Sequence, residues 1–182
     1  GHFRFQCHGE NVHHLEISLG YQHRGIEKQL IGSPHKRTSF QMEAIAGDTS
    51  VGHALAYCHL LEALSEAKVP LRAEAIRGVA LELERLANHT GDLGALAGDV
   101  AFLPTASACG ALRGDYLNMT ALLCGNRLGH SMVKPGGVHF DLDRDRMAEL
   151  QKRLRKTFDG TRRTIELLFD TPSAMSRFET TG

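Results

Sequence analysis

The sequence predicts an α+β fold, in which a mainly α-helical bundle follows a small amino-terminal antiparallel β-hairpin. Two observations support this prediction: residues 2–19 alternate in polarity around one short turn, and the apolar residues after Arg24 recur with helical spacing. We expect residues 1–182 to form a single domain, because the chain contains no long linker, internal repeat or low-complexity segment.

The hairpin is predicted from residues 2–7 and 12–19, which flank the turn-forming residues Gly9, Glu10 and Asn11. The first long helix is predicted to start at residues 48–50, where Asp48 is a suitable N-cap. Its apolar positions follow the i, i+3, i+4, i+7 pattern, and it should end near Lys68, before Pro70.

A second, long helix is expected after Pro70, and its continuation through residues 91–98 is rich in glycine and alanine. Small residues lower helix propensity but let neighbouring backbones approach closely, so this segment is predicted to lie at the centre of the bundle. After a break near residues 103–105, a third helix is predicted over residues 112–128.

A sharp turn is predicted at residues 135–137, and a last helix is expected to open at Asp141 or Asp143. Apolar residues repeat along one side of that helix, with a basic outer face that includes the charge run at 152–156. The apolar positions of this last helix are Met147, Leu150, Leu154, Phe158, Ile165 and Leu168. The tail at 172–182 is predicted to be frayed.

Composition excludes several functional classes. The chain is 42% hydrophobic and 23% charged with a formal net charge of zero, so it has no global basic field to attract nucleic acid. It lacks a run of about eighteen apolar residues, so we expect no transmembrane segment, and its start does not read as a signal peptide. Any membrane association is therefore expected to come through partner subunits.

The four cysteines are too widely spaced to form a local metal clamp, and no Cys-x-x-Cys occurs. We interpret each as a small buried hydrophobe in a reducing compartment. They are Cys7, Cys58, Cys109 and Cys124.

Four sequence blocks together resemble one family. They are HRGIEK at 23–28, EAIAGDTSVGHALA at 43–56, LELERLANH at 81–89 and KPGGVHFDLD at 134–143. The combination is similar to the large subunit of the membrane-bound, energy-converting nickel–iron hydrogenases of the formate-hydrogenlyase and hydrogenase-4 type. It is equally similar to the homologous quinone-site 49-kDa-type subunit of respiratory complex I. The resemblance extends from the hairpin to about Leu142.

The resemblance also indicates what this chain lacks. In the hydrogenases the segment matching residues 45–49 carries a Cys-x-x-Cys pair that holds nickel and iron, and here those positions are Ala46 and Thr49. Neither a methyl nor a hydroxyl group can replace a soft thiolate ligand. The family's carboxy-terminal part, with the second cysteine pair, is absent. We therefore expect that this chain supplies no metal ligand and binds no cofactor of its own. We expect it to be a truncated gene product, an expressed fragment or a naturally reduced form.

Three residues are predicted to lie around one cavity as proton- or quinone-site residues. Glu27 matches a glutamate that serves proton transfer beside the metal, although it could also be an ordinary helix-start carboxylate. His53 matches the histidine that follows the cysteine pair, or else is a structural residue. Asp99 matches an acidic residue near the quinone headgroup. Its histidine partner precedes Gly1, and the quinone-site tyrosine aligns with Gly47.

Arg127 and Lys134 match a cationic pair that the family places near the partner's iron–sulfur cluster, with dipole complementation as the alternative for Arg127. The resemblance implies a hydrogenase-like or NADH:quinone oxidoreductase-like subunit, inactive alone, that docks an iron–sulfur small subunit and membrane subunits. Its place would be peripheral, on the cytoplasmic side of the inner membrane, with quinone as a further expected ligand. It would self-associate when isolated. The alternative is a non-catalytic scaffold or assembly module.

Overall fold

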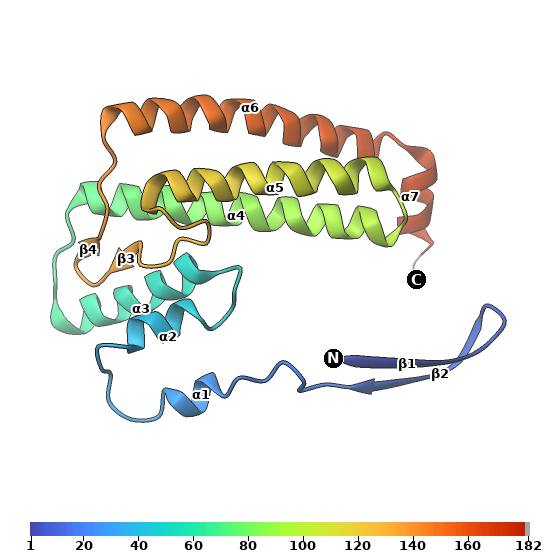
Figure 1. Cartoon of the computed structure of the whole chain (residues 1–182), viewed down its shortest axis with the longest axis horizontal. Coiled ribbons are helices and arrows are strands. Elements are labelled where there is room, and N and C mark those ends of the chain that lie inside the picture. Colours follow the sequence, from blue (N-terminus) through green and yellow to red (C-terminus); the bar gives the residue numbers. More distant parts are fainter. Residues whose placement is uncertain (181–182) are drawn as a thin grey trace. The chain divides into compact units, whose positions relative to one another are not determined.

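The computed structural model describes residues 1–180 and has the predicted α+β architecture. Its contacts divide the chain into two compact units, Gly1–His35 and Lys36–Gly182, and each is described by itself. The first unit holds the hairpin and one short helix. The second unit holds the helical bundle and a second, very short hairpin (Figure 1).

The amino-terminal hairpin is confirmed. Strands β1 (His2–His8) and β2 (Asn11–Ser18) pair antiparallel, with an irregularity between Gln6 and Cys7. Residues directly opposite each other in such a pair point to the same face. Phe3 pairs with Ile17 and Phe5 with Leu15, so one face of this ribbon is apolar. Helix α1 (Ile26–Gln29) follows, and Gly25 at its N-cap adopts a left-handed conformation.

The second unit is dominated by three long helices that run side by side, α4, α5 and α6 (Figure 1). Helix α3 and the β3–β4 hairpin lie against the first half of α4, α2 packs on α3, and α7 packs at the other end of the bundle. The bounds are α2 (Thr38–Glu43), α3 (Ser50–Ser65), α4 (Leu71–Asp99), α5 (Leu103–Cys124), β3 (Val133–Lys134), β4 (Gly137–Val138), α6 (Arg144–Phe169) and α7 (Pro172–Glu179).

Small residues bring α4 and α5 close together at Gly94, as predicted, but residues 91–98 do not lie at the centre of the bundle, because only Ala97 among them is buried. A methyl group added to Gly94 would lie 2.8 Å from the Cβ atom of Cys109, so only hydrogen fits there. The core between the long helices is closed by Ala80, Tyr116 and Met119, all fully buried. The Tyr116 hydroxyl lies 2.9 Å from the Thr161 hydroxyl of α6, which satisfies its polar end.

The predicted boundaries of the third helix and of the tail are wrong, and α5 ends at Cys124 instead of at 128. Helix α5 begins at Leu103 rather than at 112, because Pro104 occupies the first turn, where its missing N–H costs nothing. The break lies just before it, where Ala101 has a φ of 57°. The predicted frayed tail is also wrong for Pro172–Glu179, which form α7 and bury Ala174 against Leu168. Residues 181 and 182 lie outside the described part.

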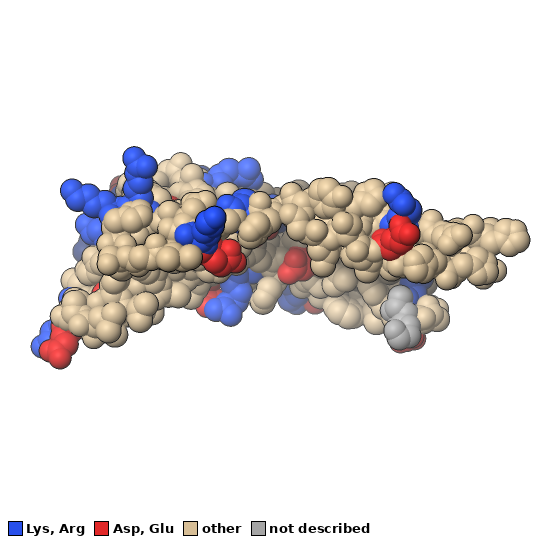
Figure 2. Space-filling view, turned by 90° about the horizontal axis from the view of Figure 1, so that it is seen from below, with Lys and Arg blue, Asp and Glu red and all other residues tan. Residues whose placement is uncertain are grey.

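Among residues 1–180, we find no helix that is both long and apolar enough to cross a membrane. Most of the face drawn in Figure 2 is uncharged, and its acidic side chains stand apart from one another. That face therefore carries no continuous patch of negative charge.

Candidate functional site

The start of α3 and the middle of α4 form an open groove of about 420 Å³. His53 projects from the first turns of α3, and His89 comes from α4. The wall between them combines polar groups with the apolar side chains of Ala56 and Leu81. The groove is also lined by Thr49, Gly52, Glu84, Arg85 and Asn88. Its exposed lining is thus largely apolar, with polar side chains among it.

His53 is held by the residue one helical turn before it. Its Nδ1 atom lies 2.9 Å from the Thr49 hydroxyl and 2.9 Å from the Thr49 carbonyl oxygen. When Nδ1 carries the proton, it donates to that carbonyl, and Nε2 remains as a proton acceptor. The Thr49 side chain is therefore already engaged with the imidazole.

Glu84 of α4 caps α3 from outside that helix. Its carboxylate accepts the Val51 N–H at 2.7 Å and the Gly52 N–H at 3.0 Å, two of the amides that a helix start leaves free. Burial raises the pKa of Glu84, and the two backbone hydrogen bonds oppose that rise. The capping role is a tertiary contact that the sequence analysis missed.

The N-cap prediction for Asp48 is wrong, because the N-cap position falls on Thr49 and makes no side-chain cap. Asp48 instead pairs with Arg113 of α5 at 3.0 Å, and its carbonyl accepts a hydrogen bond from Asn88 at 2.8 Å. These two contacts connect the segment before α3 to α4 and α5. They fix the position of the α3 start and so the shape of the groove.

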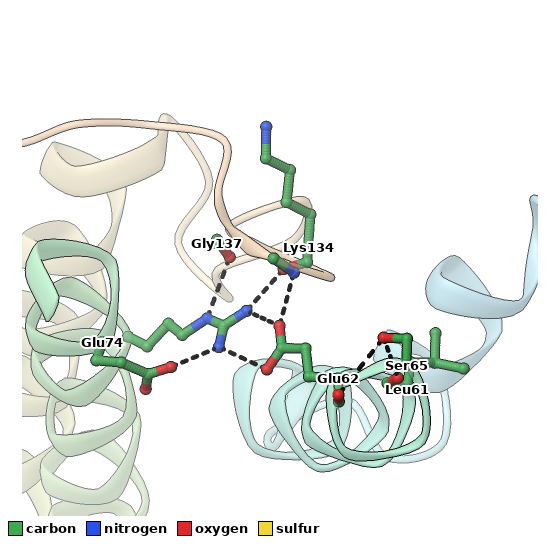
Figure 3. A network of polar contacts seen from close by, with 8 residues as sticks. Leu61, Glu62, Ser65, Glu74, Lys134 and Gly137 are labelled. Atoms are coloured by element: carbon green, nitrogen blue, oxygen red, sulfur yellow. Dashed lines mark hydrogen bonds and ion pairs between the residues drawn. The ribbon is translucent and has the colours of Figure 1, made fainter. Parts of the chain in front are cut away.

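The two predicted cations lie near opposite ends of α3. Arg127 is exposed in the loop after α5 and lines a small cavity with Glu84 and Asn88, which also line the groove. Lys134 lies at the Glu62 end, where its carbonyl oxygen accepts from Arg77 at 2.7 Å. Its ammonium group points away from the Glu62 carboxylate (Figure 3). Arg127 therefore neighbours the groove.

Asp99 does not share the His53 groove. It is the exposed last residue of α4, ten positions after His89, the groove residue nearest to it on that helix. At ~1.5 Å per residue that separation is about 15 Å along the helix. Glu27 lies in the first turn of α1 in the other unit and is exposed there. Of the two candidates in the helical unit, only His53 thus lines the groove.

A buried ion pair at the far end of α3 was missed. Arg77 of α4, 1% exposed, binds the Glu62 carboxylate of α3 through two nitrogens, at 2.5 and 3.1 Å (Figure 3). It also donates to the carbonyl oxygens of Lys134 and Gly137 and pairs with Glu74 at 3.0 Å. The hydrogen bonds from Arg77 hold the pKa of Glu62 below its ordinary value. The pair therefore joins α3, α4 and the β3–β4 turn.

A signal for this pair was present in the sequence. Arg77 occupies a position of the buried α4 stripe, four residues after Ala73 and three before Ala80. Glu62 likewise follows buried Cys58 by four residues on α3. Charged residues at positions that the helical period assigns to the core require a partner. The two could have been paired on that ground.

The residues at the family's metal position do not fit a nickel–iron centre. Ala46 offers no ligand, and the Thr49 hydroxyl is engaged with His53. Within the described chain, one cluster has metal-ligand chemistry, formed by His59, Glu62 and Glu74. Both of its carboxylates bind Arg77, whose positive charge disfavours a second cation there.

Three of the four cysteines are buried as predicted, whereas Cys7 is exposed, so the prediction is wrong for Cys7. Burial raises the pKa of Cys58 to about 11 and also raises the pKa values of Cys109 and Cys124. These three thiols are therefore protonated at neutral pH and poor nucleophiles.

The sequence around the groove resembles the large-subunit type shared by nickel–iron hydrogenases and respiratory complex I. Comparison with known proteins confirms the resemblance. Residues 99–182 match the family described as the 49 Kd subunit of respiratory-chain NADH dehydrogenase. The chain is a homologue of that subunit and of membrane-bound hydrogenase large subunits.

Three relatives illustrate the match. Hydrogenase-4 component G of Escherichia coli strain K12 is 29% identical over 100% of this chain and 33% of its own length. An NADH-quinone oxidoreductase subunit of Campylobacter curvus is 33% identical over 81% of this chain and 36% of its own. The alpha subunit of the membrane-bound hydrogenase of Pyrococcus furiosus is 30% identical over 80% and 33%. The chain thus spans about a third of these relatives.

Proposed function

We propose that the chain acts as the large-subunit component of an electron-transfer complex without a nickel–iron centre of its own. One observation carries this proposal: Thr49 stands at a thiolate position and its hydroxyl is paired with His53. The proposed role is to dock an iron–sulfur subunit, within an assembly that includes membrane subunits at the cytoplasmic side of the membrane. The complete activity would require those partners.

Within that role the chain's own residues handle protons and charge. His53 lines that groove, where its imidazole can relay a proton to a bound headgroup such as a quinone while the partner's cluster reduces it. Arg127, beside the groove, would place positive charge near a partner's cluster and stabilise its reduced form. We propose Lys134 for the same role on the β3–β4 turn. Glu27 and Asp99 are proposed as proton carriers outside the groove.

A scaffold role is the second candidate, and one observation favours it. Asp99 is exposed and does not line the groove, since it lies ten residues, or about 15 Å along α4, beyond His89, so the two helical-unit candidates are not gathered in one cavity. A protein that is retained only for its interaction surface has no need to keep polar groups together at a desolvation cost.

Co-expression with the iron–sulfur subunit encoded nearest to this chain's gene tests the docking role. We expect the two to copurify with a stoichiometric cluster and no nickel, and the charge reversal Arg127→Glu to weaken the complex. Arg113→Gln serves as a comparison: it breaks the ion pair with Asp48 and removes a positive charge, but it does not introduce a negative one. Nickel retained by the large subunit after chelation, or no complex at all, would contradict the proposal.

His53→Ala in the assembled complex separates the two candidates. If the groove handles protons, electron transfer to quinone falls while copurification is unchanged, and the pH profile of the residual activity changes. If the chain is a scaffold, both measurements match the unsubstituted complex. Thr49→Ser, which keeps the hydroxyl beside Nδ1, is the matched control and should retain activity in either case.

A further inference from the structure

One side of α6 carries an apolar strip that the bundle does not cover. Met147, Phe158 and Phe169 are spaced eleven residues apart, which is about three helical turns, so they lie in one line. The sequence assigned the first two to the buried side, yet they are 40% and 52% exposed, and Phe169 is 56% exposed. Half-buried Leu154 and Ile165 fill the intervals. The strip is about 33 Å long at ~1.5 Å per residue.

Positive charge accompanies the strip. Arg144 precedes Met147 by three residues and Arg155 precedes Phe158 by three, so each lies beside its apolar neighbour on the helix surface. Neither guanidinium group has a hydrogen-bond or ion-pair partner among residues 1–180. The one acidic residue in the same relation, Glu166 before Phe169, faces Arg162 at 3.5 Å. The strip is thus bordered by unpaired arginines.

The geometry favours a helix over a membrane as the occupant. At about 100° per residue, Phe158 lies on the flank of α6, between buried Leu168 and the outermost residue Asp159. A flat surface would first meet the outermost face, which carries charged side chains of both signs, such as Lys152 and Asp159, and not the aromatic ones. A second helix packs into the flank of the first one, with its side chains between rows. Exposed Phe, Met and Arg are also the side chains enriched in protein interfaces.

We propose that this strip, together with Arg144 and Arg155, is a docking surface for an amphipathic helix of a partner protein with acidic residues beside its apolar face. The two aromatic side chains supply the apolar contact that holds such a helix. The arginines select its charge and direction, because they lie on one border of the strip. This surface is on α6 and goes beyond the groove and the docking role proposed for the chain.

Binding of the full chain to a synthetic helical peptide tests the proposal. The probe has about 22 residues, which matches the strip at ~1.5 Å per residue, with leucine on one face and glutamate on both borders. Lysine replaces glutamate in a second peptide. We expect the acidic peptide to bind at least about tenfold more tightly than the basic one. Raising the salt concentration from ~0.05 to ~0.3 M should weaken only the acidic peptide's binding.

Surface variants locate the binding. Phe158→Ser with Phe169→Ser, and separately Arg144→Glu with Arg155→Glu, should each weaken the acidic peptide about tenfold, as expected for central interface residues. Lys152→Glu with Lys156→Glu, outside the strip, is the matched charge control and should weaken it less than about twofold. All of the substituted side chains are exposed, so the variants should fold like the unsubstituted chain.

Other outcomes would overturn the proposal. They are equal binding of the two peptides, equal losses in the two charge-reversal variants, or no binding of either peptide. Preferential binding to phosphatidylglycerol vesicles that depends on Phe158 would assign the strip to a membrane. A concentration-dependent dimer in sedimentation that the Phe158 and Phe169 substitutions abolish would assign it to a second copy of this chain.

Discussion

The two ends of α3 are built in opposite ways against the same helix, α4. At the carboxy-terminal end, Arg77 and Glu62 are buried and saturated with partners. At the amino-terminal end, Thr49, His53 and Glu84 are half-buried around an open groove. At the first end the charges neutralise one another, so that end serves stability. The second end keeps an imidazole nitrogen accessible, so it can serve chemistry.

Removing Arg77 should give the largest effect. Arg77→Ala leaves the Glu62 carboxylate buried without its cation, which costs about 3–5 kcal/mol of the free energy of unfolding. Urea denaturation measures this cost. Glu74→Gln is the control, because the Glu74 side chain is 42% exposed and should cost less than about 1 kcal/mol. Equal losses of unfolding free energy in both variants would mean that the buried Arg77–Glu62 pair stabilises the fold no more than an exposed ion pair does.

The groove end also depends on close packing. Gly129 has a φ of 74°, and a methyl group there would lie 2.4 Å from Cγ2 of Val51 in the first turn of α3. We expect Gly129→Ala to cost about 3 kcal/mol, from the left-handed backbone together with overpacking. Gly125→Ala shares the positive φ but meets no atom within 4 Å, so it should cost only ~1–2 kcal/mol. Thermal or urea unfolding compares the two variants, and equal costs would contradict the packing argument.

Loss of the Thr49 hydroxyl should have a smaller effect. Thr49→Ala removes one hydrogen-bond partner of a half-exposed imidazole, which is worth about 1 kcal/mol. Thr49→Ser restores the hydroxyl and should recover most of that loss in urea denaturation. If serine is as destabilising as alanine, the threonine acts through its methyl group instead, and the hydroxyl does not hold His53.

The smallest expected effect is the dependence of stability on pH, which has opposite signs for Glu62 and Glu84 at the two ends of α3. Glu62 has a lowered pKa, so its contribution is complete above its unfolded value near 4.5 and is lost as pH falls through the folded value. Glu84 has a raised pKa in the folded state. The stability linked to its protonation is therefore complete below its unfolded pKa near 4.5 and is lost as pH rises through its folded pKa.

Urea denaturation between pH 4 and 7 measures this difference on Glu84→Gln. The unsubstituted chain should lose stability relative to the variant as pH rises from about 4.5, because burial favours the protonated form of Glu84 in the folded state. Glu82→Gln, an exposed neighbour on α4, should show no such trend. A constant difference across the range would mean that burial does not perturb Glu84.

The sequence was sufficient for contacts that are local or strongly periodic. The hairpin around Gly9, the start of α4 after Pro70 and the α6 N-cap at Asp143 were all predictable from neighbouring residues. The start of α5 was not, because its first turns are built from small residues that carry little helical periodicity. The apolar repeat of α6 was found, yet it could not tell which of its residues the bundle would cover.

The site was predicted in part for a related reason. His53 was identified through the family motif, and its contact with Thr49 spans one helical turn. The groove itself required Glu84, which reaches the α3 amides across 32 and 33 residues. No local pattern specifies such a contact. Asp99 matched the family by position, but the straight course of α4 carries it away from the groove.

The Arg77 contacts also have a consequence for the order of folding. They join segments 57 and 60 residues apart, across the α4–α5 hairpin, and the Gly136 amide reaches Glu62 over 74 residues. Closing loops of that length is slow relative to helix formation, and desolvating the pair is favourable only once every partner is in place. We therefore expect the complete set of Arg77 contacts to form late in folding. Their loss should then speed unfolding and change the folding rate little.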